Sequence, residues 1–387
     1  MKKIIKKKIM FVFGTRPEAI KMAPIISELE KQADKLRPLI VVTGQHKEML
    51  DQVLKIFKIK PHYDLGIMKK GQSLADITAN SLRGIEKIVQ QEKPDMVLVQ
   101  GDTSTAFSAG LMAYYHKIPL GHVEAGLRTF DKWRPFPEEI NRTFISSLAD
   151  LHFAPTTTSV NNLLAEKVTR NSIYLTGNSV IDALLTVAQR RFVLSGAGLK
   201  IDLTKKLVLV TAHRRESFGK PIVNICKAIA RLAKQHKDIE IVIPVHKNPE
   251  VRQPIRKLLG KVGNVHLIEP LDYEPFVHLL KASYIILTDS GGVQEEAPSL
   301  GKPVLLLREK TERPEAVAFG TVKLVGMNED LIYREADLLL VSYSAYAKMS
   351  KAVNPYGDGR AAGRIVQAIC YYFGLAGKKP REFIVKR

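Results

Sequence analysis

The sequence has little cysteine and no long apolar run. Its 387 residues include two cysteines, Cys226 and Cys370, each within apolar, helix-like sequence, so we expect reduced, buried thiols and no disulfide framework or thiolate metal site. No stretch reaches the roughly 18 uninterrupted apolar residues of a membrane-spanning helix. Residues 1–8 are rich in lysine where a signal peptide needs about 7–15 apolar residues. These absences predict a soluble, cytoplasmic protein with no membrane partner.

Several cofactor motifs are also missing. Gly14 is followed by Thr-Arg-Pro-Glu-Ala, which is neither a Walker loop nor a G-x-G-x-x-G fingerprint. ATP hydrolysis and ordinary Rossmann NAD binding are therefore disfavoured. The chain has no H-E-x-x-H or similar ligand spacing, so we expect no metal and no cofactor.

The charge is strongly positive, with 59 Lys and Arg against 39 Asp and Glu and a formal net charge of +20. Clustered cations would suit a nucleic acid, because they neutralise phosphates. The lysines are instead scattered over amphipathic segments, and dense runs occur only at residues 2–8 and 378–381. We interpret them as solvated faces and terminal tails, and we expect no nucleic-acid partner.

Two series of apolar runs predict two parallel sheets. The first series is at residues 8–13, 38–43, 96–100, 118–123 and 151–154, and the second is at 206–210, 239–245, 265–268, 284–288 and 303–307. Helix-like stretches such as 73–91 separate the runs, as in doubly wound layers. At 387 residues the chain exceeds what one core usually supports. We therefore predict an α/β protein of two Rossmann-like doubly wound domains facing a cleft.

The domain boundaries are expected in two places. We place an N-terminal domain at 1–177, ending near Thr176-Gly177-Asn178 just after a strand-like run at 172–175, and a C-terminal domain at 178–365. Residues 366–387 then form a helix and basic tail. The helical stretch 360–373 is apolar enough to pack on another element, with the N-terminal domain as one option.

Cations follow the first predicted strand. In Gly14-Thr15-Arg16-Pro17-Glu18 the glycine permits a sharp exit, and Pro17 suits the first turn of a helix. Arg16 then lies at a helix N-terminus with Lys21 about one turn further on. A cation pair at this place suits a phosphate; the alternative is an exposed Arg and Lys.

A second candidate anion loop follows the predicted strand at 284–288. Ser290, Gly291 and Gly292 would let backbone N–H groups approach a phosphate at the start of a helix. Glu296 could accept from ribose hydroxyls, and Arg313 could reach the same phosphates. A tight turn capping a helix would explain the small residues but not their partnership with Arg313.

Three carboxylates predict acid–base chemistry. Asp102, Glu124 and Glu138 lie at strand ends or on nearby helices of the first domain, and each alone is more often a cap. Converging beside Arg142 and His213, they would form a set with tunable pKa values. Arg214 and Arg215 follow His213, which favours a donor to phosphate or sugar over a metal ligand.

Taken together, these segments resemble the non-hydrolysing UDP-N-acetylglucosamine 2-epimerases, which have glycosyltransferase-B architecture. The segments that carry the resemblance are 13–21, 122–129, 137–142, 211–216, 288–297 and 354–359. The resemblance implies a homodimer that interconverts UDP-GlcNAc and UDP-ManNAc. It implies elimination of UDP to 2-acetamidoglucal, followed by re-addition with the C2 proton on the other face.

The resemblance also assigns roles to the candidates. Cations stabilise the departing pyrophosphate, carboxylates handle protons on both faces of the sugar, and an aromatic ring stacks near the base. The cations are Arg16, Lys21, His213 and Arg313; the carboxylates are Asp102, Glu124 and Glu138, with Arg142 orienting Glu138; and the ring is that of Phe276. Leu271 stands where relatives often have Gln, so no side-chain hydrogen bond to the base is expected from it.

Many bacterial members of the family bind a second, activating UDP-GlcNAc. The residues that match that pocket are Gln45, His46, Gln72, Arg214 and His246. Gly71 stands where an Arg is typical, which speaks against allosteric activation.

Other functions remain open from the residues. The same chemistry on another sugar, such as a UDP-2,3-diacetamido uronic acid, would call for an extra cation near the sugar. A glycosyltransferase of the same fold would need an acceptor site. A non-enzymatic nucleotide-binding or nucleic-acid-binding protein would show no turnover.

Overall fold

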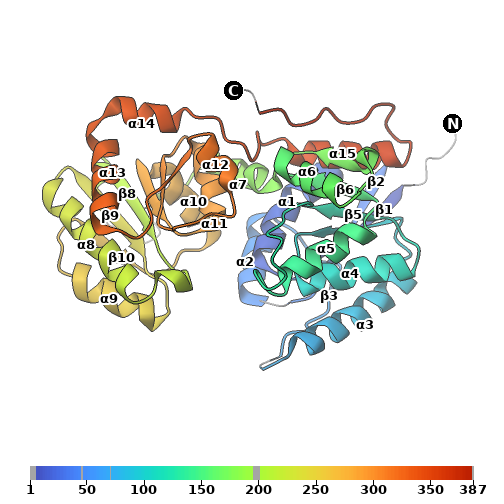
Figure 1. The fold of residues 1–387 in the computed structure, drawn as a ribbon. Helices are drawn as coiled ribbons and strands as arrows, with labels where there is room; N and C mark the ends of the chain where they lie inside the picture. Colours follow the sequence, from blue (N-terminus) through green and yellow to red (C-terminus); the bar gives the residue numbers. More distant parts are fainter. Residues whose placement is uncertain (1–5, 45–46, 70, 195–200, 386–387) are drawn as a thin grey trace. The chain divides into compact units, whose positions relative to one another are not determined.

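The structure is a computed structural model that describes residues 6–44, 47–69, 71–194 and 201–385. It divides into two compact units. The first is built from residues up to Ala183 together with Tyr356–Ile384, and the second mainly from Leu184–Pro355. Figure 1 shows each as a sheet flanked by helices, coloured along the chain.

The first unit contains a parallel sheet with strand order β3-β2-β1-β4-β5-β6-β7 among the described residues. Its strands are β1 (Lys7–Phe13), β2 (Leu36–Val42), β3 (Tyr63–Asp64), β4 (Met96–Gln100), β5 (Leu120–Val123), β6 (Leu151–Ala154) and β7 (Ile173–Leu175). Both faces of the central strands are buried, as their continuous apolar sequences require.

Helices alternate with these strands. They are α1 (Arg16–Glu30), α2 (Lys47–Ile56), α3 (Leu74–Glu92), α4 (Ser104–Tyr115), α5 (Glu138–Leu148), α6 (Thr157–Ala165) and α7 (Ser179–Ala188). The long α3 is capped by Ser73, whose hydroxyl accepts from the backbone N–H of Asp76, and the apolar side of the helix packs into the core.

The second unit repeats the plan, with strand order β10-β9-β8-β11-β12-β13 among the described residues. Its strands are β8 (Lys206–Thr211), β9 (Ile239–Pro244), β10 (Val265–Ile268), β11 (Ile285–Thr288), β12 (Val304–Leu306) and β13 (Val322–Leu324). Its helices are α8 (Lys220–Gln235), α9 (Pro249–Leu259), α10 (Tyr273–Ala282), α11 (Gly291–Glu296), α12 (Pro314–Ala318), α13 (Glu329–Val341) and α14 (Tyr343–Ser350).

The predicted α/β class with two Rossmann-like domains is confirmed. Every apolar run that the sequence marked as a strand is one, within a few residues. The sequence missed β3 and β13, which have two and three residues and lie at sheet edges, too short for an apolar pattern to stand out.

The C-terminal helix α15 (Ala361–Tyr372) belongs to the first unit, where it packs beside α1 (Figure 1). The carboxylate of Asp182 in α7 accepts from the backbone N–H groups of Ala361 and Ala362 at the start of α15. The structure thus divides the chain within α7 and at Tyr356, whereas the sequence placed the joins at 177/178 and 365/366.

Cys226 and Cys370 are free and buried, as expected. Among the described residues, no helix combines the length and apolar character needed to cross a membrane.

In each sheet the strand order reverses direction at one point. The reversal lies between β1 and β4 in the first unit and between β8 and β11 in the second. Loops at the carboxyl ends of such strands diverge and leave room for a ligand. The segments that the sequence marked as chemically active follow these strands in both units.

Candidate active site

Glu124 is held by three donors. It follows β5 with a left-handed backbone, φ 64°, and is 8% exposed. The ammonium of Lys21 lies 2.6 and 2.5 Å from its two carboxylate oxygens. The side-chain amide of Gln100 donates to Oε2, and that of Asn178 donates to Oε1 at 2.9 Å. The carboxylate is therefore fixed in place, with its charge balanced by Lys21.

Asp102 follows the neighbouring strand β4 and pairs with Arg142. Nη2 of Arg142 lies 2.5 Å from Oδ2 of Asp102. The amide of Asn141 donates to the backbone carbonyl of Asp102 at 2.9 Å. Burial raises the pKa of Asp102 above its usual range; Arg142 opposes the shift, and the charge of Glu124 adds to it. Such a carboxyl can exchange a proton closer to neutral pH than an exposed Asp.

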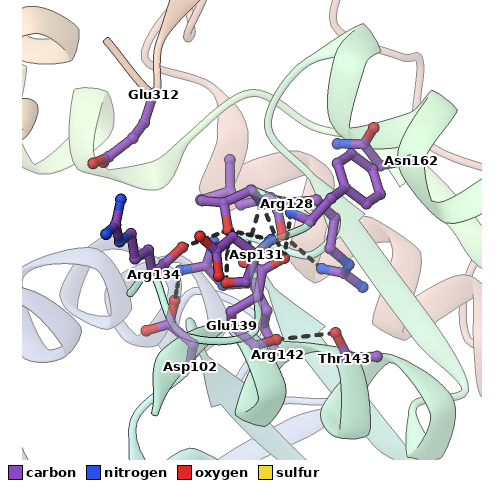
Figure 2. A network of polar contacts seen from close by, with 12 residues as sticks. Asp102, Arg128, Asp131, Arg134, Glu139, Arg142, Thr143, Asn162 and Glu312 are labelled. Atoms are coloured by element: carbon purple, nitrogen blue, oxygen red, sulfur yellow. Dashed lines mark hydrogen bonds and ion pairs between the residues drawn. The ribbon is translucent and has the colours of Figure 1, made fainter. Parts of the chain in front are cut away.

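Arg142 contacts Glu139, whereas the resemblance implied that Arg142 orients Glu138. Figure 2 shows Asp102, Glu139 and Arg142 in one network of polar contacts. Nη1 of Arg142 lies 3.4 Å from Oε2 of Glu139, and no bond joins Arg142 to Glu138 among the described residues. Residues three and four apart can both share a face of a helix, so spacing alone does not choose between Glu139 and Glu138; the choice follows from Glu139 being the one that faces the interior. Glu138 is half-buried at the first position of that helix.

Glu139 was not among the sequence candidates. It is 4% exposed, and its carboxylate accepts from the backbone N–H groups of Thr129 and Phe130. It therefore joins the loop before α5 to Arg142. The adjacent pair Glu138-Glu139 was visible in the sequence, but only the fold shows which of the two faces inward.

Glu18 is a second carboxylate that sequence reasoning passed over. It is 2% exposed and accepts from the N–H groups of Gly14 and Thr15 at 3.0 and 2.8 Å, and from the hydroxyl of Thr103 at 2.7 Å. Burial raises its pKa, against the effect of these hydrogen bonds. It links the loop after β1 to the loop after β4. The Thr-x-x-Glu spacing from Thr15 to Glu18, which is typical of a capping box, was the feature of the sequence that could have identified it.

The expected cation pair of α1 is divided between two environments. Arg16 begins the helix, as predicted, and its side chain has no hydrogen bond or ion pair with any other described residue. Lys21 instead forms an ion pair with Glu124. The structure therefore places only Arg16 where it is available to an added anion.

In the second unit, the loop after β8 is organised by Asp289. This carboxylate is fully buried and accepts from the backbone N–H groups of His213 and Arg214 at 2.8 and 2.9 Å, and from the hydroxyl of Ser217 at 2.9 Å. Nδ1 of His213 lies 3.3 Å from Oδ1 of Asp289. Burial lowers the pKa of His213, and Asp289 partly opposes the shift. Because Asp289 holds the backbone of both residues, the two side chains start from fixed positions at this edge of the sheet.

Two guanidinium groups meet at Gly291, the first residue of α11. A Cβ added to Gly291 would lie 2.7 Å from Nη1 of Arg313 and 3.4 Å from Nη2 of Arg214. The Nε of Arg313 donates to Glu295. Ser290 is the N-cap residue, and Gly292 follows within the helix. Arg214, which the resemblance assigned to a separate activating site, thus lies beside the candidate phosphate loop.

The two residues predicted to contact the nucleoside, Glu296 and Phe276, differ in burial. Glu296 is 8% exposed, and its Oε1 accepts from the hydroxyl of Tyr273 at 3.5 Å. Burial, together with the charge of Glu296, raises the pKa of Tyr273 well above its usual value. Phe276 is half-buried on α10, so part of its ring is available for stacking.

The candidate activating residues are distributed over both units. Gln72 is used within its own loop: it accepts from the N–H of Lys69 and donates to the carbonyl of Ile67, both at 2.7 Å. The ring of His246 lies 6.0 Å from that of His213, centroid to centroid. Gln45 and His46 lie outside the described residues.

Among the described residues, no group of three or more His, Cys, Asp or Glu side chains is arranged to hold a metal ion.

Comparisons with known proteins agree on one family. Residues 27–370 match the model of the family described as UDP-N-acetylglucosamine 2-epimerase. The chain is 54% identical over 371 residues to the UDP-N-acetylglucosamine 2-epimerase of Escherichia coli K12, covering 94% of this chain and 98% of that protein.

Two solved structures are similar over nearly their full length. One is the UDP-GlcNAc 2-epimerase from Neisseria meningitidis bound to UDP-GlcNAc, with TM-score 0.83, 50% identity and coverage of 94% of this chain and 100% of that one. The other is S. aureus MnaA with UDP, with TM-score 0.85, 52% identity and coverage of 97% and 100%.

Proposed function

Because the chain belongs to the UDP-N-acetylglucosamine 2-epimerase family, a family of isomerases, we propose that it interconverts UDP-GlcNAc and UDP-ManNAc. The observation that supports this most is the pair of carboxylates at the ends of the adjacent strands β4 and β5. Asp102 is paired with Arg142 and Glu124 with Lys21, in a chain about half identical to the named epimerases.

The proposed reaction is elimination and re-addition. The C2 hydrogen of the sugar is not next to a carbonyl carbon, so simple enolisation is unavailable. A base instead takes the C2 proton, the C1–O bond breaks with its electron pair leaving on UDP, and 2-acetamidoglucal forms. UDP then adds back at C1 while an acid delivers a proton to the opposite face of C2.

The proton-handling groups in this proposal are Asp102, Glu124 and Glu138. Asp102 fits a proton carrier, because burial raises its pKa above that of an exposed Asp and so makes it a weaker acid. Glu124 is held rigidly by its donors, which suits a group that must meet one atom of the substrate. Glu138 is half-buried at the start of α5 and keeps its assignment from the family.

The UDP-binding part of the proposal rests on the second unit. Arg214 and Arg313 bring two positive charges to Gly291, and His213 is fixed on the adjacent loop by Asp289. These groups would stabilise the charge that develops on the departing pyrophosphate. Arg16 is assigned as a further cation for the phosphates, and Phe276 and Glu296 are assigned to the nucleoside.

Gly291→Ala tests the arginine pair. The new methyl group would lie 2.7 Å from Nη1 of Arg313, closer than side chains tolerate, so Arg313 must move. We expect UDP affinity, measured by calorimetry, to fall about tenfold or more, since charge-assisted hydrogen bonds are worth roughly 1.5–3 kcal/mol. Gly263→Ala is the matched control, because a Cβ there meets nothing within 4 Å. Unchanged UDP affinity in Gly291→Ala would contradict this assignment.

The activity itself is tested by proton NMR of the enzyme with UDP-GlcNAc in D2O, without added NAD, metal or acceptor. We expect UDP-ManNAc that carries deuterium at C2. Unchanged UDP-GlcNAc would contradict the proposal for this substrate. A repeat with UDP-2,3-diacetamido uronic acid, and another with added sugar acceptors, would then separate a different epimerase from a glycosyltransferase.

A further inference from the structure

Asn178 caps a helix and also donates a hydrogen bond to a distant carboxylate. It lies between β7 and α7 and is 3% exposed. Its Oδ1 accepts from the backbone N–H of Val180 at 3.1 Å, which is a local cap. Its Nδ2 reaches across the unit to the Oε1 of Glu124, 2.9 Å away and 54 residues earlier in the chain. One side chain therefore serves both the start of α7 and the candidate catalytic carboxylate.

The backbone of Asn178 is fixed independently. Its N–H donates to the carbonyl of Tyr356 at 2.7 Å. The glycine before it, Gly177, has φ 81°, and a Cβ there would lie 3.3 Å from the Cα of Gly357. A side chain at this position would be strained by the positive φ and would press on Gly357. Tyr356 is where the chain returns to the first unit, and α7 is where the chain leaves it. Both crossing segments are thus joined at Asn178.

We propose that Asn178 is a positioning residue for catalysis: its amide orients the Glu124 carboxylate toward the sugar, from a backbone anchored where the chain passes between its two units. This inference rests on the proposed function and deepens it. Its basis is the bond from Nδ2 to Glu124 together with the anchored N–H. Without the Asn178 amide, Glu124 would keep its hydrogen bonds from Lys21 and Gln100. It would lose the donor to Oε1 that comes from the residue just before α7.

The charged groups around Glu124 set the expected pH response. Lys21 faces it from α1, and Asp102 from the loop after β4. The neutral amide of Gln100 faces it from β4 itself. A second carboxylate at position 178 would add a like charge within hydrogen-bond distance of Oε1. Two carboxylates at such a distance cannot both ionise freely, so one of the two pKa values rises strongly.

Two variants separate positioning from mere packing. Asn178→Asp keeps the Oδ1 cap on Val180 and the side-chain volume, but it replaces the donor with a negative charge. Asn178→Ala removes the donor without adding charge. Asn224→Asp is the control, because among the described residues that half-buried amide in the second unit donates only to the carbonyl of Met327, at 3.2 Å.

We expect kcat for UDP-GlcNAc to fall about tenfold or more in both Asn178 variants, with KM changed less than kcat. In Asn178→Asp alone, the acidic limb of the kcat profile should move upward by about one pH unit or more. Asn224→Asp should keep the wild-type profile. An unmoved profile with wild-type kcat in Asn178→Asp overturns the inference.

A substrate-free measurement keeps the inference testable even if UDP-GlcNAc is not turned over. A pKa raised by folding contributes stability at low pH that is lost as pH rises through the folded value. The Tm deficit of Asn178→Asp relative to wild type should therefore grow from pH 5 to pH 8, while that of Asn178→Ala stays level. A level deficit in both variants contradicts the contact with Glu124. An inactive wild-type enzyme with a growing deficit instead rejects only the proposed substrate.

Discussion

Asp102→Asn is expected to lower kcat about 100-fold or more while leaving the fold intact. The substitution keeps the shape of the side chain but removes the proton that a catalytic acid or base must exchange. Arg142 keeps Glu139 as a carboxylate partner, so its charge does not become isolated. Steady-state kinetics over a pH series, with UDP-GlcNAc as substrate, measures the loss.

The stability of Asp102→Asn should change with pH in a defined direction. Burial raises the folded-state pKa of Asp102, so the ionised group costs more in the folded protein than in the unfolded chain. The wild-type group therefore stabilises at low pH, and this contribution is lost as pH rises through the folded value. The Tm of the variant relative to wild type should increase from pH 4 to pH 8. Near-wild-type turnover at all pH values would remove Asp102 from the mechanism.

Glu124→Gln is expected to lower kcat by a similar factor and also to destabilise the protein. The ammonium of Lys21 would lose its charged partner in a site where the two side chains are only 16% and 5% exposed. Breaking such a pair from one side costs on the order of 3 kcal/mol. Urea unfolding measures the stability, and the same NMR assay measures the activity.

A double variant separates the two effects of Glu124→Gln. Adding Lys21→Met removes the unpaired ammonium, so the double variant should be more stable than Glu124→Gln alone. Activity should stay lost, because the proton-handling carboxylate is still missing. If restoring stability also restored turnover, Glu124 would be structural and the proposed mechanism would fail at this residue.

The arrangement of the carboxylates could be predicted from sequence only in part. Asp102 and Glu124 each follow an apolar run, and parallel strands bring their carboxyl ends to one edge of a sheet. The choice between Glu138 and Glu139 could not be made this way. It depends on how α5 is rotated about its axis, which is set by the packing of its apolar residues such as Ile145 against the core.

The residues that the cations contact could not be predicted from the sequence either. Lys21 and Arg16 look equivalent in their motif, yet only Lys21 meets a carboxylate that follows a strand two places away in the sheet. Arg214 and Arg313 are 99 residues apart in numbering, and their meeting at Gly291 depends on β8, β11 and β12 being adjacent. Contacts of this kind have no local signal.

The amino-acid pattern by itself determined the alternation of strands and helices, the two-sheet fold class and the loops that carry the candidate site residues. Apolar periodicity and turn residues act over a few positions, so they can be read locally. Tertiary structure alone decided that Glu124 receives donors from α1, β4 and the start of α7, that Glu139 rather than Glu138 meets Arg142, and that Asn178 joins the chain crossings to the carboxylate. These pairings depend on strand order and helix rotation, which are fixed only when distant segments pack together.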